Sequence, residues 1–290
     1  MILDAHVQLV SGDDVTYPKR EDANDWPATP VGSVLAQMDA GGIERALAAQ
    51  AFFTYGTSNR YLIDSAEAHP DRLASGCALD PLAEAASDQL RHIVRNHGVR
   101  GLRLIGGKRP GVFGHPRTLA LWQRAAELDL PVFVGADLTE LADLAVPLER
   151  FPQVPVALDH MWVPGLGAPP YTRIEPLLQL ARFPNVHLKL LPNLASAARR
   201  GGAEPQLLFG QLADHFGPQR LMWGSNYPAH REEFGSIGDR LALMRADLAF
   251  LGDDACAQIF GRTAATFWRQ TAECAKARRP SRSPTRPART

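Results

Sequence analysis

The sequence predicts a single (β/α)8 barrel, an α/β fold in which eight parallel strands alternate with helices. Eight short runs rich in β-branched and aliphatic residues alternate with longer helical stretches along the chain. Residues 4–15, which follow the first run, lack the glycine-rich turn of a dinucleotide-binding doubly wound sheet, so that fold is the second choice. Polar side chains stand at the ends of five runs, where a barrel gathers its active-site groups.

The expected elements follow one another at short intervals. Strands are predicted at residues 2–7, 45–50, 73–79, 100–104, 131–135, 154–160, 186–190 and 220–225. Helices are predicted between them at residues 31–40, 60–69, 84–96, 116–129, 139–150, 174–183 and 205–216. Glycine or proline marks many helix-to-strand junctions, as at Gly98, Pro131 and Pro184, which is typical of short connecting loops.

Composition limits the class of protein. The chain has 290 residues, of which 45% are hydrophobic, so it can bury a full-sized core. Its 31 basic and 31 acidic residues balance, which argues against a nucleic-acid-binding or membrane-surface protein. Six basic residues and no acidic residue lie in positions 276–290, beside three prolines. We therefore predict a barrel domain at residues 1–272 and a disordered basic, Pro/Arg-rich tail at 273–290, a solvated end or an anion-docking segment.

The cysteines and the N-terminus indicate the compartment. Cys77, Cys256 and Cys274 are odd in number and widely spaced, which gives neither a disulfide framework nor a metal knuckle. The opening residues carry no basic region before Asp4, and no run of 18 apolar residues occurs. We expect a soluble protein of a reducing compartment, the cytoplasm.

Ionisable side chains gather at the ends of the predicted strands. The first strand ends with Asp4, His6 and Gln8, which strict alternation would place on one face. The sixth ends with Asp159 and His160, and there we expect His160 to face inward and Asp159 to face the opposite way. His6 and His160 are candidate catalytic groups because imidazole has an unperturbed pKa of about 6.5.

Two cations lie on strands that should be buried. Arg103 belongs to the fourth strand, and Lys189 belongs to the seventh on the same face as His187. A buried cation needs a partner. That partner is either a substrate carboxylate, which makes both cations candidate substrate-binding residues, or a structural carboxylate such as Asp4 or Asp159.

Amide and aromatic side chains complete the candidate ligand site. Gln8 ends the first strand and Asn226 ends the eighth. Tyr55 lies in the loop after the second strand, while Trp162 and Tyr227 follow the sixth and eighth strands. These aromatic rings are either the wall of a site for a ring-shaped ligand or ordinary packing residues.

Eight segments in chain order make this sequence resemble the second amidohydrolase family. The resemblance covers about residues 2–268 and implies an amidohydrolase-like barrel. Family members include 2-pyrone-4,6-dicarboxylate hydrolases, sugar-acid lactonases and related decarboxylases. The segments that carry it are ILDAHVQL, LAQMDAGGIERAL, YGTSNRYLID, VRGLRL, ALDHM, NVHLKL, RLMWGSNYP and IFGRTAATFW.

Three positions depart from the metal-binding pattern that the resemblance implies. Gln8 replaces the second histidine of strand one, Gly135 stands where a histidine ligand is expected, and Asn226 replaces the aspartate that binds the ion and accepts a proton. Only His6 and His160 remain as clear ligands, whereas zinc takes three or four. We predict no metal ligand and no cofactor, with a bound divalent metal as the less favoured alternative. An amide cannot be a general base, but Asn226 can donate a hydrogen bond to a developing oxyanion.

The leading prediction is a metal-independent hydrolase of a small lactone or other cyclic ester that carries a carboxylate. His160 or His6 would activate water. One alternative is a decarboxylase, dehydratase or isomerase on the same barrel, and another is a ligand-binding member that has lost its chemistry. The expected partner is a small-molecule substrate rather than nucleic acid or a membrane, and such barrels often form homodimers.

Overall fold

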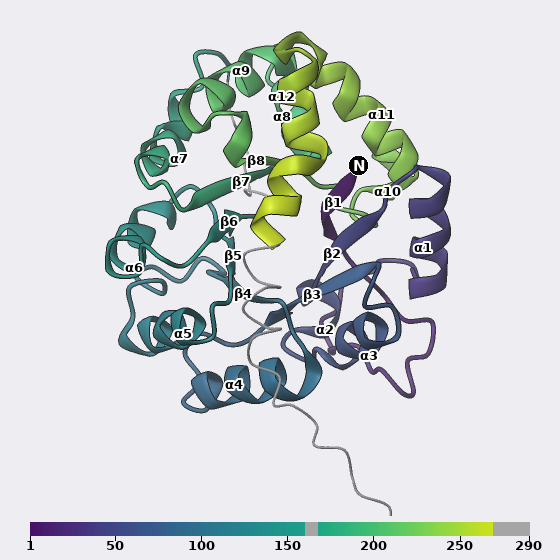
Figure 1. Ribbon diagram of the computed structural model, residues 1–290, viewed down its shortest axis with the longest axis vertical. Coiled ribbons are helices and arrows are strands. Elements are labelled where there is room, and N and C mark those ends of the chain that lie inside the picture. The colour runs from purple at the N-terminus through teal and green to yellow at the C-terminus, as the bar shows by residue number, and fades with distance from the viewer. Residues whose placement is uncertain (160–167, 269–290) are drawn as a thin grey trace, which may run out of the picture.

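A computed structural model describes residues 1–159 and 168–268 and shows eight parallel strands in one sheet, with the order β1 to β8 following the chain (Figure 1). Every predicted strand position is occupied, although the sixth and eighth strands are shorter than expected. The strands are β1 (Leu3–Val7), β2 (Arg45–Ala49), β3 (Leu73–Ala78), β4 (Gly101–Ile105), β5 (Val132–Gly135), β6 (Val156–Leu158), β7 (Val186–Leu190) and β8 (Leu221–Trp223).

The sheet closes between its first and last strands just beyond β8. Val7 pairs with Tyr227 in a parallel bridge. The backbone N–H of Asn226 donates to the carbonyl of His6 at 2.8 Å, and that of Gln8 donates to the carbonyl of Tyr227, also at 2.8 Å. The predicted (β/α)8 barrel is confirmed.

Helices surround the barrel, and local signals set many of their ends (Figure 1). Pro116 occupies the first turn of α5, Ser236 and Asp239 form a capping box at the start of α11, and Gly98 ends α4 in the left-handed conformation. The helices are α1 (Val31–Ala40), α2 (Phe52–Tyr55), α3 (Arg60–Ala68), α4 (Ala86–His97), α5 (Pro116–Glu127), α6 (Ala145–Arg150), α7 (Glu175–Gln179), α8 (Pro192–Arg200), α9 (Pro205–Phe216), α10 (Arg231–Phe234), α11 (Ile237–Leu248) and α12 (Asp253–Ala257).

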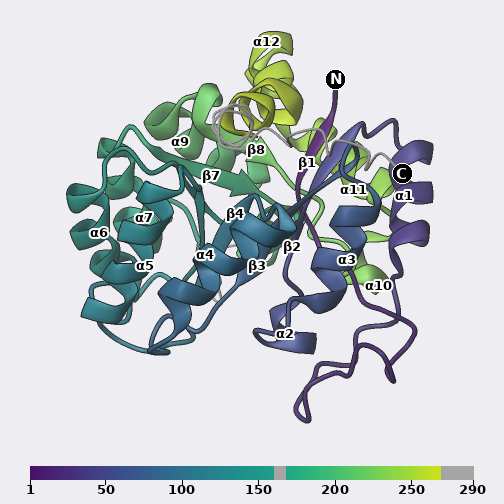
Figure 2. The same cartoon turned by 60° about the horizontal axis from the view of Figure 1, so that its bottom comes forward.

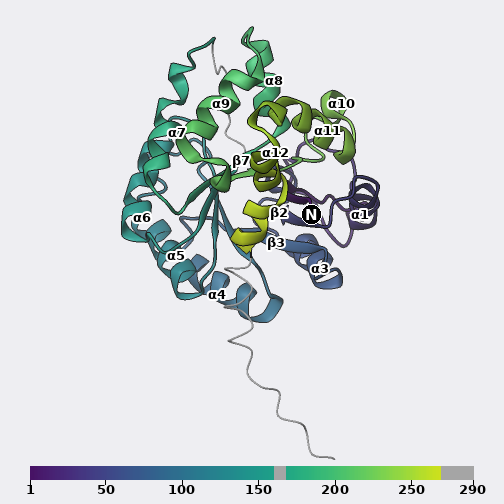
Figure 3. The same cartoon turned by 45° about the horizontal axis from the view of Figure 1, so that its top comes forward.

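One end of the barrel interior is apolar. We call this cluster the apolar floor, and its buried side chains are Leu3, Ala5, Leu47, Phe133, Ala157, Met222, Ala264 and Phe267. The chain after α12 supplies Phe267, whose ring lies 5.9 Å from that of Phe133. The α12 region crosses the barrel opening in Figures 1 and 3. Gly101 is required beside the floor, because a Cβ there would lie 1.9 Å from the Phe133 ring.

The carboxyl ends of the strands face the opposite side of the molecule. Figure 2 shows α2 and the loop of residues 11–28 at this side, away from α12 and the N-terminus. In the part of the chain that the structure describes, no helix combines the length and apolarity needed to span a bilayer. The predicted tail, residues 273–290, lies outside the described residues.

Candidate functional site

Four ionisable side chains meet inside the barrel above the apolar floor, and we call them the charged layer. They are His6 of β1, Arg103 of β4, Asp159 just after β6, and Lys189 of β7, and all are buried. Asp159 is their centre. Its Oδ1 accepts from Lys189 Nζ at 2.6 Å and its Oδ2 accepts from Arg103 Nε at 2.7 Å. His6 Nδ1 lies 3.4 Å from Asp159 Oδ1 and 3.4 Å from Lys189 Nζ.

The inward position of Asp159 corrects our expectation that it faces away from the barrel interior. On β6, Ala157 belongs to the apolar floor, while Val156 and Leu158 pack in the outer core between sheet and helices. Side chains alternate along a strand, so the residue that follows Leu158 points inward. The expected alternation was therefore out of phase by one residue at Asp159.

Strand β1 also departs from strict alternation. Its register against β2 shifts between Asp4 and Val7, and Leu3 and Ala5 belong to the apolar floor. His6 reaches the charged layer, whereas Asp4 Oδ1 accepts from the backbone N–H groups of His6 and Ser225. The prediction that Asp4 and His6 share one face is therefore wrong, because an irregularity in the strand changes the phase between them.

Burial and charge set the protonation states of the charged layer. Burial lowers the pKa of His6 from 6.5 to about 3, although the Asp159 carboxylate opposes this change. Burial alone would raise the pKa of Asp159, but Lys189 and Arg103 hold it well below its usual range. Burial lowers the pKa of Lys189, and Asp159 offsets part of that effect. Near pH 7 the His6 imidazole is thus neutral and Asp159 is a carboxylate.

Arg103 and Lys189 are both paired with a structural carboxylate, Asp159. This is one of the two kinds of partner expected from the sequence, the other being a substrate carboxylate. Lys189 has a second partner in addition to Asp159. Its Nζ lies 4.3 Å from the centre of the Phe133 ring, which belongs to the apolar floor, and this cation–π contact stabilises the ammonium. Arg103 Nη1 donates to the carbonyl of Gln50 at 2.6 Å. Among the residues described, Arg103 Nη2 forms no hydrogen bond.

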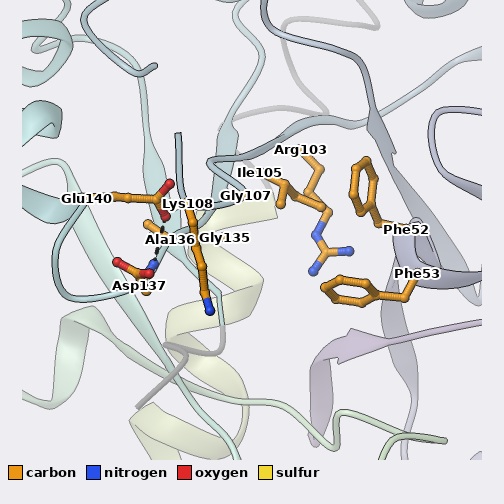
Figure 4. A pocket seen from close by; sticks show the side chains of 10 residues that line it. All are labelled: Phe52, Phe53, Arg103, Ile105, Gly107, Lys108, Gly135, Ala136, Asp137 and Glu140. Atoms are coloured by element: carbon orange, nitrogen blue, oxygen red, sulfur yellow. Dashed lines mark hydrogen bonds between the residues drawn. The ribbon is translucent and has the colours of Figure 1, made fainter. Parts of the chain in front are cut away.

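A cavity of about 290 Å³ adjoins the charged layer, and Arg103 belongs to its wall (Figure 4). Phe52 and Phe53 of α2 lie on either side of the Arg103 guanidinium in this view. The remaining lining residues come from the ends of β4 and β5 and from the loops that follow them, and they are Ile105, Gly107, Lys108, Gly135, Ala136, Asp137 and Glu140. The cavity therefore combines an aromatic wall with charged groups of both signs.

Glu140 holds the two loops together at the far side of this cavity. Its Oε1 accepts from the backbone N–H of Arg109 at 3.0 Å. Its Oε2 accepts from the backbone N–H of Asp137 at 3.0 Å (Figure 4). Gly106 leaves space for the carboxylate, because a Cβ there would lie 2.4 Å from Oε1. The Glu140 side chain therefore has a bracing role.

Sequence reasoning missed Phe52 and Phe53 as cavity residues. We singled out Tyr55 in the same segment, but its hydroxyl accepts from the backbone N–H of Ser11 at 2.8 Å, and its ring packs with Val10 and Ala51. A recognisable signal was present, since two consecutive phenylalanines lie shortly after the end of β2, at the carboxyl end of the barrel.

Gln8 and Asn226 face each other beside the charged layer. Gln8 Nε2 donates to Asn226 Oδ1 at 3.3 Å, and both side chains are buried. Asn226 has a φ of 56°, a left-handed conformation that asparagine tolerates better than most residues. The structure thus brings His6, Gln8, Arg103, Lys189 and Asn226 to one end of the barrel.

The remaining candidates lie elsewhere or outside the described residues. The Tyr227 hydroxyl accepts from Gln37 Nε2 of α1 at 2.8 Å, and its ring faces the Arg240 guanidinium of α11 at 5.2 Å. Tyr227 therefore packs among the helices and does not line the cavity, contrary to the expected aromatic wall. His160 and Trp162 lie outside the described residues.

The described donors do not fit a divalent ion. Asp159 and His6 Nδ1 both face the Lys189 ammonium, while Gln8 and Asn226 bind each other. Within residues 1–159 and 168–268, no group of three or more His, Cys, Asp and Glu side chains could hold a metal. The Lys189 ammonium therefore contacts Asp159 and His6 Nδ1, the two strongest potential metal ligands among the described residues of this site.

Comparisons with known proteins agree with this architecture. The amidohydrolase family pattern matches residues 3–270. An L-fucono-1,5-lactonase from Burkholderia ambifaria is 34% identical over 132 residues, which cover 41% of this chain and 43% of that protein. The chain therefore aligns with less than half of this curated relative.

Solved structures match over nearly the whole chain. A protein from Pseudomonas putida, provisionally assigned as a 2-pyrone-4,6-dicarboxylic acid hydrolase, is 25% identical with a TM-score of 0.76, over 93% of this chain and 97% of that one. An amidohydrolase from Burkholderia multivorans with bound zinc is 20% identical with a TM-score of 0.76, over 93% and 99% of the two chains, and shows the shared fold.

The fold and its charged mouth thus define an α/β-barrel protein of the amidohydrolase type. The family match spans nearly the whole described chain, and the protein belongs to the amidohydrolase family.

Proposed function

We propose that this protein is a metal-independent lactonase that opens a small cyclic ester bearing a carboxylate. The observation that carries the proposal is the sharing of one carboxylate, Asp159, by the buried cations Arg103 and Lys189. The similarity to an L-fucono-1,5-lactonase and to a 2-pyrone-4,6-dicarboxylic acid hydrolase supports the reaction class.

Charge balance supports an anionic ligand. The charged layer holds two cations and one carboxylate, and residues 160–167, which follow Asp159, contain no acidic residue. A buried charge without a counter-ion is costly. A substrate carboxylate near Arg103, or the oxyanion that forms when water attacks the ester, would supply the missing negative charge.

The protonation states divide the catalytic roles. The lowered pKa of His6 makes its neutral imidazole a weak base. We therefore assign His6 to hydrogen bonding with the substrate and assign water activation to His160, the chain neighbour of Asp159. Asn226 is the proposed amide donor to the oxyanion, and Gln8 orients it.

Metal independence is part of the proposal because Lys189 supplies the positive charge that an ion would bring. Its ammonium is held between Asp159 and the His6 ring, so no vacant set of donors is left among the described residues. Activity should survive treatment with a chelator, and purified protein should carry less than one metal ion per chain. Loss of activity on chelation with recovery on adding zinc would overturn this part.

The reaction is tested by incubating the protein with a panel of neutral and carboxylate-bearing lactones and measuring the masses of the products. Wild type should add one water to at least one carboxylate-bearing lactone, and His160→Ala should lower kcat by about 10²–10⁴-fold, the range for general-base loss. His215→Ala is the matched control, because this ring is exposed and its hydrogen bond goes to the Gln211 carbonyl of its own helix. Equal turnover by wild type and His160→Ala would remove His160 from the mechanism.

Arg103→Met tests the carboxylate preference. Charged hydrogen bonds contribute about 1.5–3 kcal/mol, so KM should rise about tenfold or more for carboxylate-bearing lactones and less for neutral ones.

The product masses also distinguish the alternative reaction. Loss of carbon dioxide rather than gain of water would identify a decarboxylase on the same barrel.

A further inference from the structure

The turn after β8 holds Asn226 in a demanding conformation. Asn226 is left-handed, with a φ of 56°. Two residues earlier, Gly224 packs so closely on β1 that a Cβ would lie 2.9 Å from the His6 Cβ and 2.7 Å from the Leu191 side chain. The turn therefore needs support from its surroundings to keep the Asn226 carboxamide beside Gln8.

Asp4 holds this turn from the β1 side. Its Oδ1 accepts from the backbone N–H of Ser225 at 2.8 Å and from that of His6 at 2.9 Å. The Ser225 hydroxyl donates to the His6 carbonyl at 3.3 Å and accepts from the Tyr227 N–H at 3.1 Å. One carboxylate thus joins the residue before Asn226 to the strand that carries His6.

Arg240 of α11 holds the same peptide from the helix side. Its Nη1 donates to the Ser225 carbonyl at 3.0 Å, and its Nε donates to the Gly235 carbonyl at 3.3 Å. The guanidinium lies 5.2 Å from the centre of the Tyr227 ring and 5.6 Å from that of Phe234. Arg240 is completely buried, so its position is set by these neighbours.

Both charges are retained although burial disfavours them. Burial raises the pKa of Asp4 to about 6 and lowers that of Arg240 to about 10. Asp4 Oδ2 and Arg240 Nη2 have no hydrogen-bond partner among the residues that the structure describes. Neutral groups could satisfy the same backbone at a smaller desolvation cost.

We propose that Asp4 and Arg240 are positioning residues that hold the Ser225 peptide from both sides and so fix Asn226 and His6 relative to each other. The Asn226 N–H donates to the His6 carbonyl at 2.8 Å, so a shift of the turn would move both side chains of the site. The proposal rests on the proposed hydrolysis only for the kinetic consequence, because the hold on the turn is a property of the structure.

The kinetic test uses Arg240→Met, which keeps the bulk between the two rings and removes the donors. A displacement of about 1 Å in a catalytic site can cost about a hundredfold in rate. We expect kcat to fall about ten- to a hundredfold while KM changes less than about threefold. Arg245→Met is the matched control on the same helix, because Arg245 faces the Phe260 ring at 5.9 Å, away from the turn, and it should keep wild-type kcat.

Amide hydrogen exchange tests the hold itself without any substrate. In Arg240→Met, the amides of Ser225, Asn226 and Tyr227 should exchange at least about tenfold faster, while those of β4 keep wild-type rates. Asp4→Asn keeps an oxygen acceptor for Ser225 and removes the charge, so it should give a smaller acceleration at the same amides. It also serves as the second variant should Arg240→Met fold poorly.

Kinetics and hydrogen exchange together distinguish the positioning of the Ser225 turn from the proposed hydrolysis. If wild type hydrolyses no lactone, the proposed function fails, and exchange still decides whether Asp4 and Arg240 hold the turn. Wild-type kcat and unchanged exchange in both variants would overturn the positioning role. Faster exchange spread equally over all strands would also overturn it, because that pattern marks a merely structural residue.

Discussion

The two layers of the barrel interior contrast sharply. The apolar floor is held by packing of side chains such as Phe133 and Phe267, which is nondirectional and tolerates small shifts. The charged layer above it depends on directed contacts around Asp159, each between groups that burial disfavours. The contrast indicates that apolar packing holds one layer and that paired charges hold the other. Under our proposal, the charged layer also prepares the barrel to meet a charged ligand. Substitutions in each layer test this division.

The largest effect is expected from Asp159→Asn in the charged layer. The change leaves Arg103 and Lys189 buried without a carboxylate, and breaking such a pair costs about 3–5 kcal/mol of unfolding free energy. Urea denaturation measures the loss, and activity should disappear with it. Asp14→Asn is the control, because its pair with Lys19 is exposed and should contribute less than about 1 kcal/mol. Similar losses in both variants would contradict the division.

The matching change in the apolar floor is Phe267→Ala. Removing a buried phenylalanine ring costs about 3–5 kcal/mol of unfolding free energy, and Phe267 is buried. The folded variant should keep kcat within about threefold of wild type, since the ring lies on the floor away from the cavity. A large fall in kcat with little loss of stability would show that the two layers are not independent.

Acid pH should weaken the charged layer. His6 has a folded pKa of about 3, below its unfolded value of 6.5, so its contribution to stability is present above pH 6.5 and is lost as pH falls toward 3. Asp159, whose pKa is also lowered, acts in the same direction. Asp4 acts oppositely, because its raised pKa makes stability fall as pH rises from about 3.8 to about 6.

Urea titrations between pH 7 and pH 4 measure this dependence. One group changes the unfolding free energy by at most about 1.4 kcal/mol per pH unit. His6→Asn should therefore show a shallower decline in acid than wild type. A decline of the same slope in both proteins would mean that His6 is not the group that titrates.

The smallest effect is expected from Tyr227→Phe, outside both layers. It removes the hydroxyl that accepts from Gln37 and should cost about 1 kcal/mol. Because Tyr227 packs against α1 and α11, KM should not change. A rise in KM of more than about threefold would return Tyr227 to the ligand site that its sequence position suggested.

Much of the candidate site followed from the sequence because strand ends are easy to locate. Five polar residues were selected at the carboxyl ends of predicted strands, namely His6, Gln8, Arg103, Lys189 and Asn226. The structure brings them to one end of the barrel, as the fold requires. Their catalytic and binding roles stay predictions, together with those of His160 and Trp162.

What the sequence could not supply was the direction of individual side chains. Asp159 was expected to face away from the barrel interior, and the β1 irregularity that separates Asp4 from His6 leaves no local signal. Phe52 and Phe53 enter the cavity because the short helix α2 folds them toward Arg103, a contact between distant parts of the chain.

The sequence by itself determined the barrel, the order of its strands and the polar character of its mouth, because periodicity and turn residues are local properties of the chain. Only the tertiary structure decided that Asp159 serves two cations and that Lys189 takes the donors an ion would need. Those pairings depend on strand register and on side chains that meet across the barrel, and burial makes their charges sensitive to every neighbour.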